Sequence, residues 1–171
     1  THPGILMSIW LGMKMVICHK WDPKKAVELV EREQVTRCAG VRAMSMELIN
    51  AATSMGVTLD SIRNLDAGGA GRPADQVGIL AEAVPHALIG TGWGMTETNG
   101  MGVGLRGEEF IANPGVAGRL QAPLPQIKIV DEYHQEVPTG EVGELVFKCV
   151  SNMRCYLNQP QATADVLRDG W

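Results

Sequence analysis

The stretch that most constrains the fold of this chain is residues 90–100, Gly-Thr-Gly-Trp-Gly-Met-Thr-Glu-Thr-Asn-Gly. Glycine permits positive φ angles and lets other groups approach the backbone closely. An apolar run, residues 87–89, comes directly before this stretch. This order is typical of a buried strand that delivers a binding loop at its carboxyl end, as in open α/β sheets. The sequence therefore predicts a ligand-binding loop on an α/β fold.

A second predicted strand leads into glycines in the same way. Residues 62–65 are expected to form a strand, and the glycine motif at residues 68–70, Gly-Gly-Ala, follows. Residues 73–84 lie between the two stretches and are expected to form a helix, with Asp75 in the first turn, where the helix dipole favours a carboxylate. Parallel strands joined by a helix place both glycine stretches at one edge of a sheet. That edge is the predicted site.

Hydrophobic periodicity predicts further helices and strands. Asp22 and Pro23 begin a helix that ends near Glu33, because the carboxylate can cap free N–H groups and proline at the first position loses no needed donor. The other expected elements are a mostly buried helix over residues 4–11, a strand over 14–18, a strand over 35–39, a helix over 42–54 and a helix over 159–167.

The pattern changes after residue 113, where short β-rich segments replace the alternation of helices and strands. Residues 126–131 and 143–150 are expected to be strands, with a turn rich in Pro and Gly between them. We therefore predict two domains. Residues 1–113 form a partial α/β nucleotide-binding subdomain, and residues 114–171 form part of a small β-rich subdomain.

Composition excludes some classes of partner. The chain has 15 Lys and Arg against 19 Asp and Glu, a net charge of −4, so no basic field attracts nucleic acid. No apolar run reaches the roughly 18 residues of a membrane span, and none is expected. The four cysteines form no Cys-x-x-Cys motif, which favours reduced thiols and a cytoplasmic location over a zinc site. The oligomeric state stays open.

Thr96 and Glu97 are the chemical pair of the first stretch. A threonine hydroxyl can donate to a phosphate oxygen, and a neighbouring carboxylate can bind Mg²⁺, which prefers oxygen and keeps few protein ligands. Trp93 can stack on a nucleotide base. The alternative is a glycine-rich turn with a buried tryptophan and a solvated glutamate.

Residues 93–97, Trp-Gly-Met-Thr-Glu, resemble the Tyr-Gly-x-Thr-Glu motif of the adenylate-forming (AMP-binding) superfamily. Other segments match the same superfamily in order and spacing, and the similarity covers essentially the whole chain. They are residues 67–70, 114–119, 127–131, 136–145, 156–160 and 169–171. The segment at residues 23–33 most resembles fatty acyl-CoA synthetases. The sequence departs from the family at Trp93, which replaces the usual Tyr, and at Cys155, where Gly is common.

The resemblance implies an ATP-dependent reaction with ATP, Mg²⁺ and coenzyme A. A carboxylate attacks the α-phosphate of ATP, pyrophosphate leaves, and the acyl group passes from the adenylate to a thiol. In this resemblance Thr96 contacts the α-phosphate and Glu97 binds Mg²⁺; these two are the candidate catalytic residues. The candidate nucleotide-binding residues are Gly68, Gly69, Ala70, Gly92, Trp93, Gly94, Met95 and Thr96.

The resemblance also implies a fold and an incomplete machinery. The fold is part of an open, largely parallel sheet with flanking helices, followed by a small β-rich, distorted barrel-like subdomain. The phosphate loop is expected before Thr1, and the ribose-binding Asp and the domain with the catalytic Lys are expected after Trp171. The 171 residues are therefore expected to be a fragment of the N-terminal domain that is inactive alone.

The resemblance places the acyl group near residues 90–100 and beside the helix at residues 41–48, where the surrounding residues are Met, Ala, Gly and Val. An apolar lining favours a fatty or other apolar carboxylic acid over an amino acid, because an unpaired ammonium group is costly to bury. Chain length is not determined by this argument. Two alternatives stay open: an adenylating enzyme that loads a carrier protein or another acceptor, and a nucleotide-binding module without catalysis.

Overall fold

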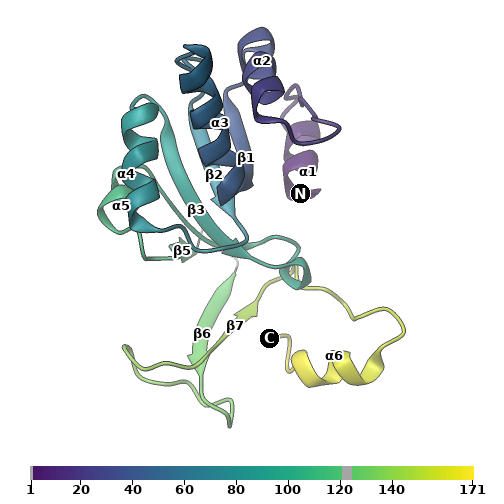
Figure 1. Ribbon diagram of the computed structural model, residues 1–171. Coiled ribbons are helices and arrows are strands. Elements are labelled where there is room, and N and C mark those ends of the chain that lie inside the picture. Colours follow the sequence, from purple (N-terminus) through teal and green to yellow (C-terminus); the bar gives the residue numbers. More distant parts are fainter. Residues whose placement is uncertain (1, 121–124) are drawn as a thin grey trace. The chain divides into compact units, whose positions relative to one another are not determined.

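The computed structural model describes residues 2–120 and 125–171 (Figure 1). The chain forms two compact units. The first unit comprises Thr1–Trp93 and Val103–Arg119, and the second comprises Gly94–Gly102 and Leu120–Trp171. The boundary expected near residue 114 stays a prediction.

A five-stranded sheet organises the first unit, with strands in the order β1-β2-β3-β4-β5. The strands are β1 (Arg37–Val41), β2 (Asn64–Gly68), β3 (Leu88–Gly94), β4 (Gly102–Arg106) and β5 (Arg119–Leu120). β1 pairs in parallel with β2, and β2 pairs in parallel with β3, with Gly68 opposite Gly92. The predicted α/β fold with an open, largely parallel sheet is confirmed.

Five helices precede or connect these strands. They are α1 (His2–Trp10), α2 (Pro23–Glu33), α3 (Arg42–Met55), α4 (Ala74–Ala83) and α5 (Gly107–Ala112). The predicted start of α2 is confirmed, because the Asp22 carboxylate accepts from the N–H groups of Lys24 and Lys25 at 3.0 and 3.1 Å. A carboxylate in this position satisfies donors that the first helical turn leaves without partners.

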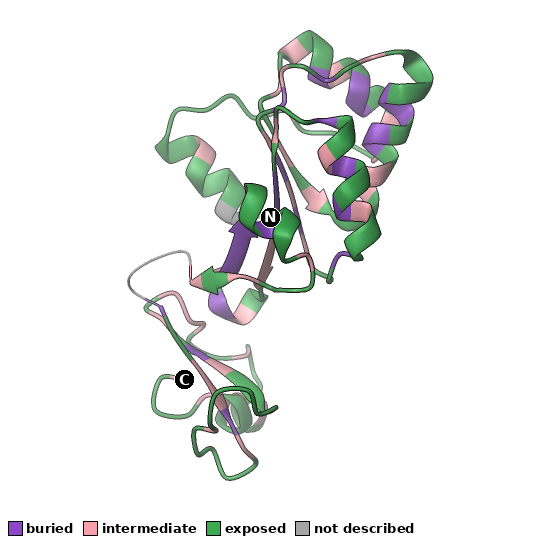
Figure 2. Cartoon of the chain, turned by 90° about the vertical axis from the view of Figure 1, so that its left-hand side faces the viewer, coloured by how far each residue is buried: buried purple, intermediate pink, exposed green. Residues whose placement is uncertain are grey.

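The hydrophobic core of the first unit lies between the sheet and its helices (Figure 2). Leu65 of β2 and Ile89 of β3 are each 1% exposed, while Leu80 of α4 and Phe110 of α5 are fully buried. Each such side chain contributes about 1.5–3 kcal/mol through removal of apolar surface from water. Ile62, Leu65 and Ile89, from the two segments predicted as strands, therefore lie in the core and fix the strands that carry the glycine stretches.

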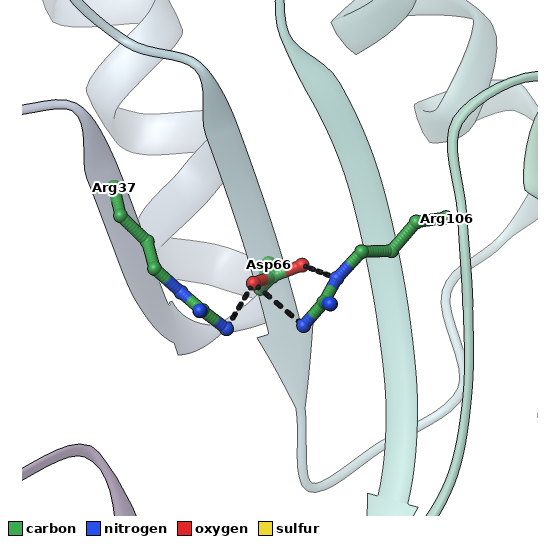
Figure 3. A network of polar contacts seen from close by, with 3 residues as sticks. All are labelled: Arg37, Asp66 and Arg106. Carbon is green, nitrogen blue, oxygen red and sulfur yellow. Dashed lines mark hydrogen bonds and ion pairs between the residues drawn. The ribbon is translucent and has the colours of Figure 1, made fainter. Parts of the chain in front are cut away.

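The other face of the sheet carries a polar network (Figure 3). Asp66 on β2 accepts from Arg37 on β1 at 2.8 Å and from Arg106 at the end of β4 at 2.8 and 3.2 Å. The network crosses β3 at Gly90, where a Cβ atom would collide with Asp66 Oδ1 and lie 2.7 Å from Arg106 Cγ. Gly90 is thus required by packing in the fold, with no ligand needed to explain it.

Three strands of the sheet, β1, β2 and β3, extend further toward their carboxyl ends than predicted. β1 was expected at residues 35–39, β2 at 62–65 and β3 at 87–89, yet they end at Val41, Gly68 and Gly94. Apolar side chains mark only the buried part of a strand, whereas ladder hydrogen bonds also join glycines. Much of the first glycine stretch is therefore strand and not loop. Residues 101–113, which had no assignment, hold β4 and α5.

Two expectations near the amino terminus are wrong. Residues 14–18 form no strand, because apolar residues alone supply no pairing partner and β1 is the edge strand of the sheet. The expected helix at residues 4–11 is observed as α1, but it is not mostly buried: Ile9 is 72% exposed and Trp10 is 79% exposed in the described chain.

The second unit is small and β-rich, as predicted. β6 (Gln126–Val130) and β7 (Glu144–Lys148) form an antiparallel pair, which α6 (Pro160–Val166) follows in the chain. Val130 and Phe147 are its buried apolar side chains on these strands. The last residue, Trp171, lies with its ring centroid 4.5 Å from the Lys128 ammonium, a favourable cation–π distance.

Candidate functional site

The second unit begins with a tight turn built around Thr98. The short 3₁₀ helix η1 (Thr96–Thr98) follows β3 directly. Thr98 is 1% exposed, and its hydroxyl lies 3.0 Å from the carbonyl of Met95 and 2.5 Å from that of Met101. The same oxygen accepts from the Met95 N–H at 3.3 Å. A buried hydroxyl with these partners closes the turn and fixes the direction in which its neighbours point.

Thr96 and Glu97 are presented by this turn. Thr96 is exposed, and its hydroxyl has no hydrogen-bond partner among the described residues. Glu97 is half-buried, and its Oε1 accepts from the Tyr156 hydroxyl at 2.7 Å. This hydrogen bond lowers the pKa of the Glu97 carboxyl and raises the pKa of the Tyr156 phenol. The pair thus combines an available hydroxyl with a carboxylate held in its charged form.

The donor set around Glu97 fits Mg²⁺ better than a metal held only by protein. Within residues 2–120 and 125–171, no group of three or more His, Cys, Asp or Glu side chains gathers as a metal site. Tyr156 is the only other residue in the same ranges that donates to the Glu97 carboxylate, and it contacts Oε1. Mg²⁺ is commonly bound through one or two carboxylates together with substrate phosphates and water. A single carboxylate with few protein partners matches that chemistry.

The glycines predicted to contact the nucleotide base meet on the ladder between β2 and β3. A Cβ atom at Gly68 would lie 3.4 Å from the Gly92 carbonyl oxygen, and one at Gly92 would lie 3.2 Å from that of Val103. Gly69 has a φ of +83° and open space at its Cβ position. Ala70 is exposed. This part of the first unit therefore presents backbone and one methyl group, with little side-chain bulk.

Trp93 and Gly94 end β3. Trp93 is half-buried and belongs to the first unit, whereas Gly94 begins the second unit. A Cβ atom at Gly94 would lie 2.9 Å from the Gly100 carbonyl oxygen, so the close approach of the two ends of the turn requires glycine. Met95 is 43% exposed.

The predicted site residues fall into two groups. The structure brings Gly68 to Ala70 beside Gly92 in the first unit, and it holds Thr96 beside Glu97 in the second. Reasoning from the sequence missed Thr98 and Tyr156 as the residues that fix this pair. Tyr156 lay in a matched family segment, but it is 59 positions from Glu97, and no local pattern links residues so far apart.

A further feature of the second unit lies apart from the predicted site residues. A shallow depression of about 360 Å³ lies beside the β6–β7 hairpin, lined by residues that include Tyr133 and Val142, and no predicted site residue lines it. Among the described helices, none has the length and apolar content that crossing a membrane requires.

Comparison with known families decides the classification. A family model described as AMP-binding enzyme matches residues 1–157. The chain belongs to the AMP-binding enzyme family. The Thr96–Glu97 turn and the glycine ladder both lie inside the matched segment, so the resemblance of the motifs and the family match rest on the same residues.

Named relatives of this AMP-binding chain are longer proteins. A feruloyl-CoA synthase from Amycolatopsis sp. is 30% identical over 167 residues, which are 97% of this chain and 33% of the relative. The structure of a Mycobacterium tuberculosis fatty acyl CoA synthetase is similar with a TM-score of 0.86 and 24% identity, over 98% of this chain and 33% of that one. The chain spans about a third of the length of the relatives it matches.

A third similar structure was solved with ligands. O-succinylbenzoate Coenzyme A Synthetase (MenE) from Bacillus subtilis, in complex with ATP and magnesium ion, matches 98% of this chain and 34% of its own, with a TM-score of 0.84 and 24% identity. At these identities the two structural matches establish the fold. The predicted membership in the adenylate-forming superfamily is confirmed by the family match over residues 1–157.

Proposed function

We propose that the full-length protein carrying this chain is an AMP-forming acyl-CoA synthetase. It activates a carboxylic acid with ATP as an acyl-adenylate and transfers the acyl group to coenzyme A. The observation that carries this proposal is the turn at η1 in a chain of the AMP-binding family, where the exposed Thr96 lies next to the Glu97 carboxylate, which the Tyr156 hydroxyl holds through Oε1.

The proposed roles follow from the chemistry of each residue. Thr96 would donate a hydrogen bond to the α-phosphate, and Glu97 would hold Mg²⁺. A bound Mg²⁺ would offset the negative charge of the phosphates that a carboxylate must approach. Reactions of this kind depend on positioning and electrostatics more than on acid–base chemistry. The rigid turn closed by Thr98 supports that requirement.

The base of the nucleotide is proposed to lie against the glycine ladder. Gly68, Gly69, Ala70 and Gly92 leave backbone accessible to a flat ring, and Trp93 offers an aromatic face for stacking. Gly94 and Met95 are proposed to contact the nucleotide as well.

The proposed substrate is a fatty or other apolar carboxylic acid. The names of the relatives support both an aromatic and an aliphatic acyl group, since one is a feruloyl-CoA synthase and another a fatty acyl CoA synthetase. A cytoplasmic location is also proposed, and it is supported by the four cysteines, which are all free thiols.

The test is a panel of carboxylates supplied to the full-length protein with ATP and Mg²⁺. Acyl-CoA formation and the loading of a carrier protein are measured side by side, on straight-chain fatty acids and on hydroxycinnamates. We expect acyl-CoA formation with at least one apolar acid and none with free amino acids. Loading of the carrier alone would support the other acceptor, and no adenylate with any acid would indicate a binding module.

The 171 residues by themselves are expected to be inactive. The residues of a catalytic constellation act as a positioned set, and loss of one member costs orders of magnitude. ATP–pyrophosphate exchange by the purified 171-residue chain, with a fatty acid and Mg²⁺, measures this directly. Exchange clearly above that of a Glu97→Ala control would show that the 171 residues hold the complete machinery.

A further inference from the structure

Three hydrogen bonds attach the turn at η1 to residues 151–156, which we name the anchoring segment. Ser151 Oγ donates to the Thr98 carbonyl at 3.0 Å, and the Met153 N–H donates to the Glu97 carbonyl at 2.7 Å. The Tyr156 hydroxyl donates to Glu97 Oε1 at 2.7 Å. Two of these bonds hold the backbone of the turn, while the third alone holds the side chain of Glu97.

The anchoring segment is itself fixed at both ends within the second unit. Asn152 Nδ2 donates to the Phe147 carbonyl of β7 at 2.9 Å. The Tyr156 N–H donates to Thr163 Oγ1 of α6 at 2.9 Å, and that hydroxyl donates to the Gln159 carbonyl at 2.8 Å. The phenol of Tyr156 is therefore presented from a backbone with a defined position, which a free loop would not provide.

We propose that Tyr156 is a positioning residue for cation binding by Glu97. Its hydroxyl holds the carboxylate through Oε1 and leaves Oε2 for the Mg²⁺ that accompanies ATP. A glutamate side chain with three rotatable bonds loses rotamer freedom when it binds a metal, and a side chain already held loses less. The inference rests on the proposed role of Glu97 and adds a residue that the catalytic motif does not contain.

The test compares Tyr156→Phe with Tyr133→Phe in the full-length protein. Both changes remove one phenolic hydroxyl. Tyr133 is the other of the 2 tyrosines in the chain, and it is 75% exposed. We measure the Mg²⁺ concentration that half-activates ATP–pyrophosphate exchange, and the rate at saturating Mg²⁺. Tyr156→Phe should raise the half-activating concentration about two- to tenfold, the range of one hydrogen bond, with a smaller effect on the saturated rate. Tyr133→Phe should change neither.

A second readout avoids turnover. Mn²⁺ replaces Mg²⁺, and its binding in the presence of a non-hydrolysable ATP analogue is followed by electron paramagnetic resonance. Mn²⁺ affinity should weaken about two- to tenfold in Tyr156→Phe and stay unchanged in Tyr133→Phe. Equal affinities in wild type and Tyr156→Phe would overturn the proposal.

Combination with Glu97 variants separates positioning from a merely structural role. In a Glu97→Ala background, Tyr156→Phe should have no further effect on the half-activating concentration; an additional loss would overturn the proposal. If Tyr156→Phe does not fold, Glu97→Asp is measured in its place, because the shorter side chain moves the carboxylate away from the Tyr156 hydroxyl. Glu97→Asp should weaken Mn²⁺ binding at least twofold, by loss of that bond, and wild-type binding would overturn the proposal.

The experiments distinguish a wrong role for Glu97 from a wrong role for Tyr156. If Glu97→Ala leaves both the Mg²⁺ dependence and Mn²⁺ binding unchanged, the proposed role of Glu97 fails, and the role of Tyr156 fails with it. If Glu97→Ala weakens both while Tyr156→Phe changes neither, only the positioning role is wrong.

Discussion

The two units hold their candidate residues by different means. In the first unit, the glycines of β2 and β3 belong to a sheet whose opposite face packs on a core that includes Leu65 and Ile89. In the second unit, Thr96 and Glu97 lie on a three-residue 3₁₀ helix held by hydrogen bonds from residues over 50 positions away. One group is fixed by the fold of the unit, the other by a few individual contacts.

This difference predicts different responses to mutation. Changes at the sheet should act through stability, because a collision there displaces a strand or the core. Changes at the turn should act through cation binding with little loss of stability, because each hydrogen bond contributes only about 0.5–1.5 kcal/mol net. A large stability effect at the turn, or none at the sheet, would break the distinction.

The largest stability effect is expected for Gly118→Ala. Gly118 has a φ of +117°, and a Cβ atom there would overlap the backbone of Gly104. Positive φ and overpacking together should cost about 3 kcal/mol or more, seen as a lower melting temperature of the full-length protein. Gly115→Ala is the matched control, since nothing lies within 4 Å of its Cβ position. Equal melting temperatures for the two variants would contradict the packing assigned to Gly118.

A smaller loss is expected for Gly90→Ala. The added methyl group collides with Asp66 Oδ1 in the network of Figure 3, and displacement of that network should cost about 1–3 kcal/mol. Gly78→Ala in α4 has open space and should stabilise the protein by about 0.5–1 kcal/mol, as alanine is the better helix former.

The cause of the Gly90→Ala loss can be tested by a second substitution in the same network. In an Asp66→Ala background the colliding oxygen is absent, so Gly90→Ala should cost less there than in the wild type. Thermal melting of the four proteins gives this comparison, and an unchanged cost would mean that Asp66 does not set the requirement for glycine.

The smallest expected effect needs no mutation and concerns the reactivity of a cysteine in the sheet of the first unit. Burial raises the pKa of the Cys38 thiol on β1 to about 11. At pH 8 only about one thiol in a thousand would then be the reactive thiolate, and the fraction grows as pH rises toward 11. Alkylation with iodoacetamide, followed by peptide mass mapping, should label the exposed Cys18 and Cys155 at least about tenfold faster than Cys38. Equal alkylation rates at pH 8 would contradict the burial of Cys38 in the first unit.

Much of the first unit could be predicted because its determinants are local. Neighbouring residues predict the strands that lead into the glycines, the helix start at Asp22–Pro23 and the helix between β2 and β3. The strand at residues 14–18 was wrong because pairing depends on a partner strand. The ends of β2 and β3 were placed too early because glycine carries no apolar signal.

The candidate site was predictable only in part, for the same physical reason. The types of Thr96 and Glu97 indicate phosphate and Mg²⁺ chemistry wherever they lie. Their fixation by Thr98 and Tyr156 depends on burial and on a contact between distant segments, which composition and periodicity do not encode. The Asp66 network likewise joins three strands, and none of its members stood out in the sequence.

The most direct test of the account is the Mg²⁺ dependence of ATP–pyrophosphate exchange by the full-length protein with Glu97→Ala. Glu132→Ala, an exposed carboxylate in the same unit, is the matched control. Loss of a metal ligand should slow exchange at limiting Mg²⁺ by about tenfold to a thousandfold, while Glu132→Ala should match the wild type. Near-normal exchange by Glu97→Ala at limiting Mg²⁺ would contradict the account.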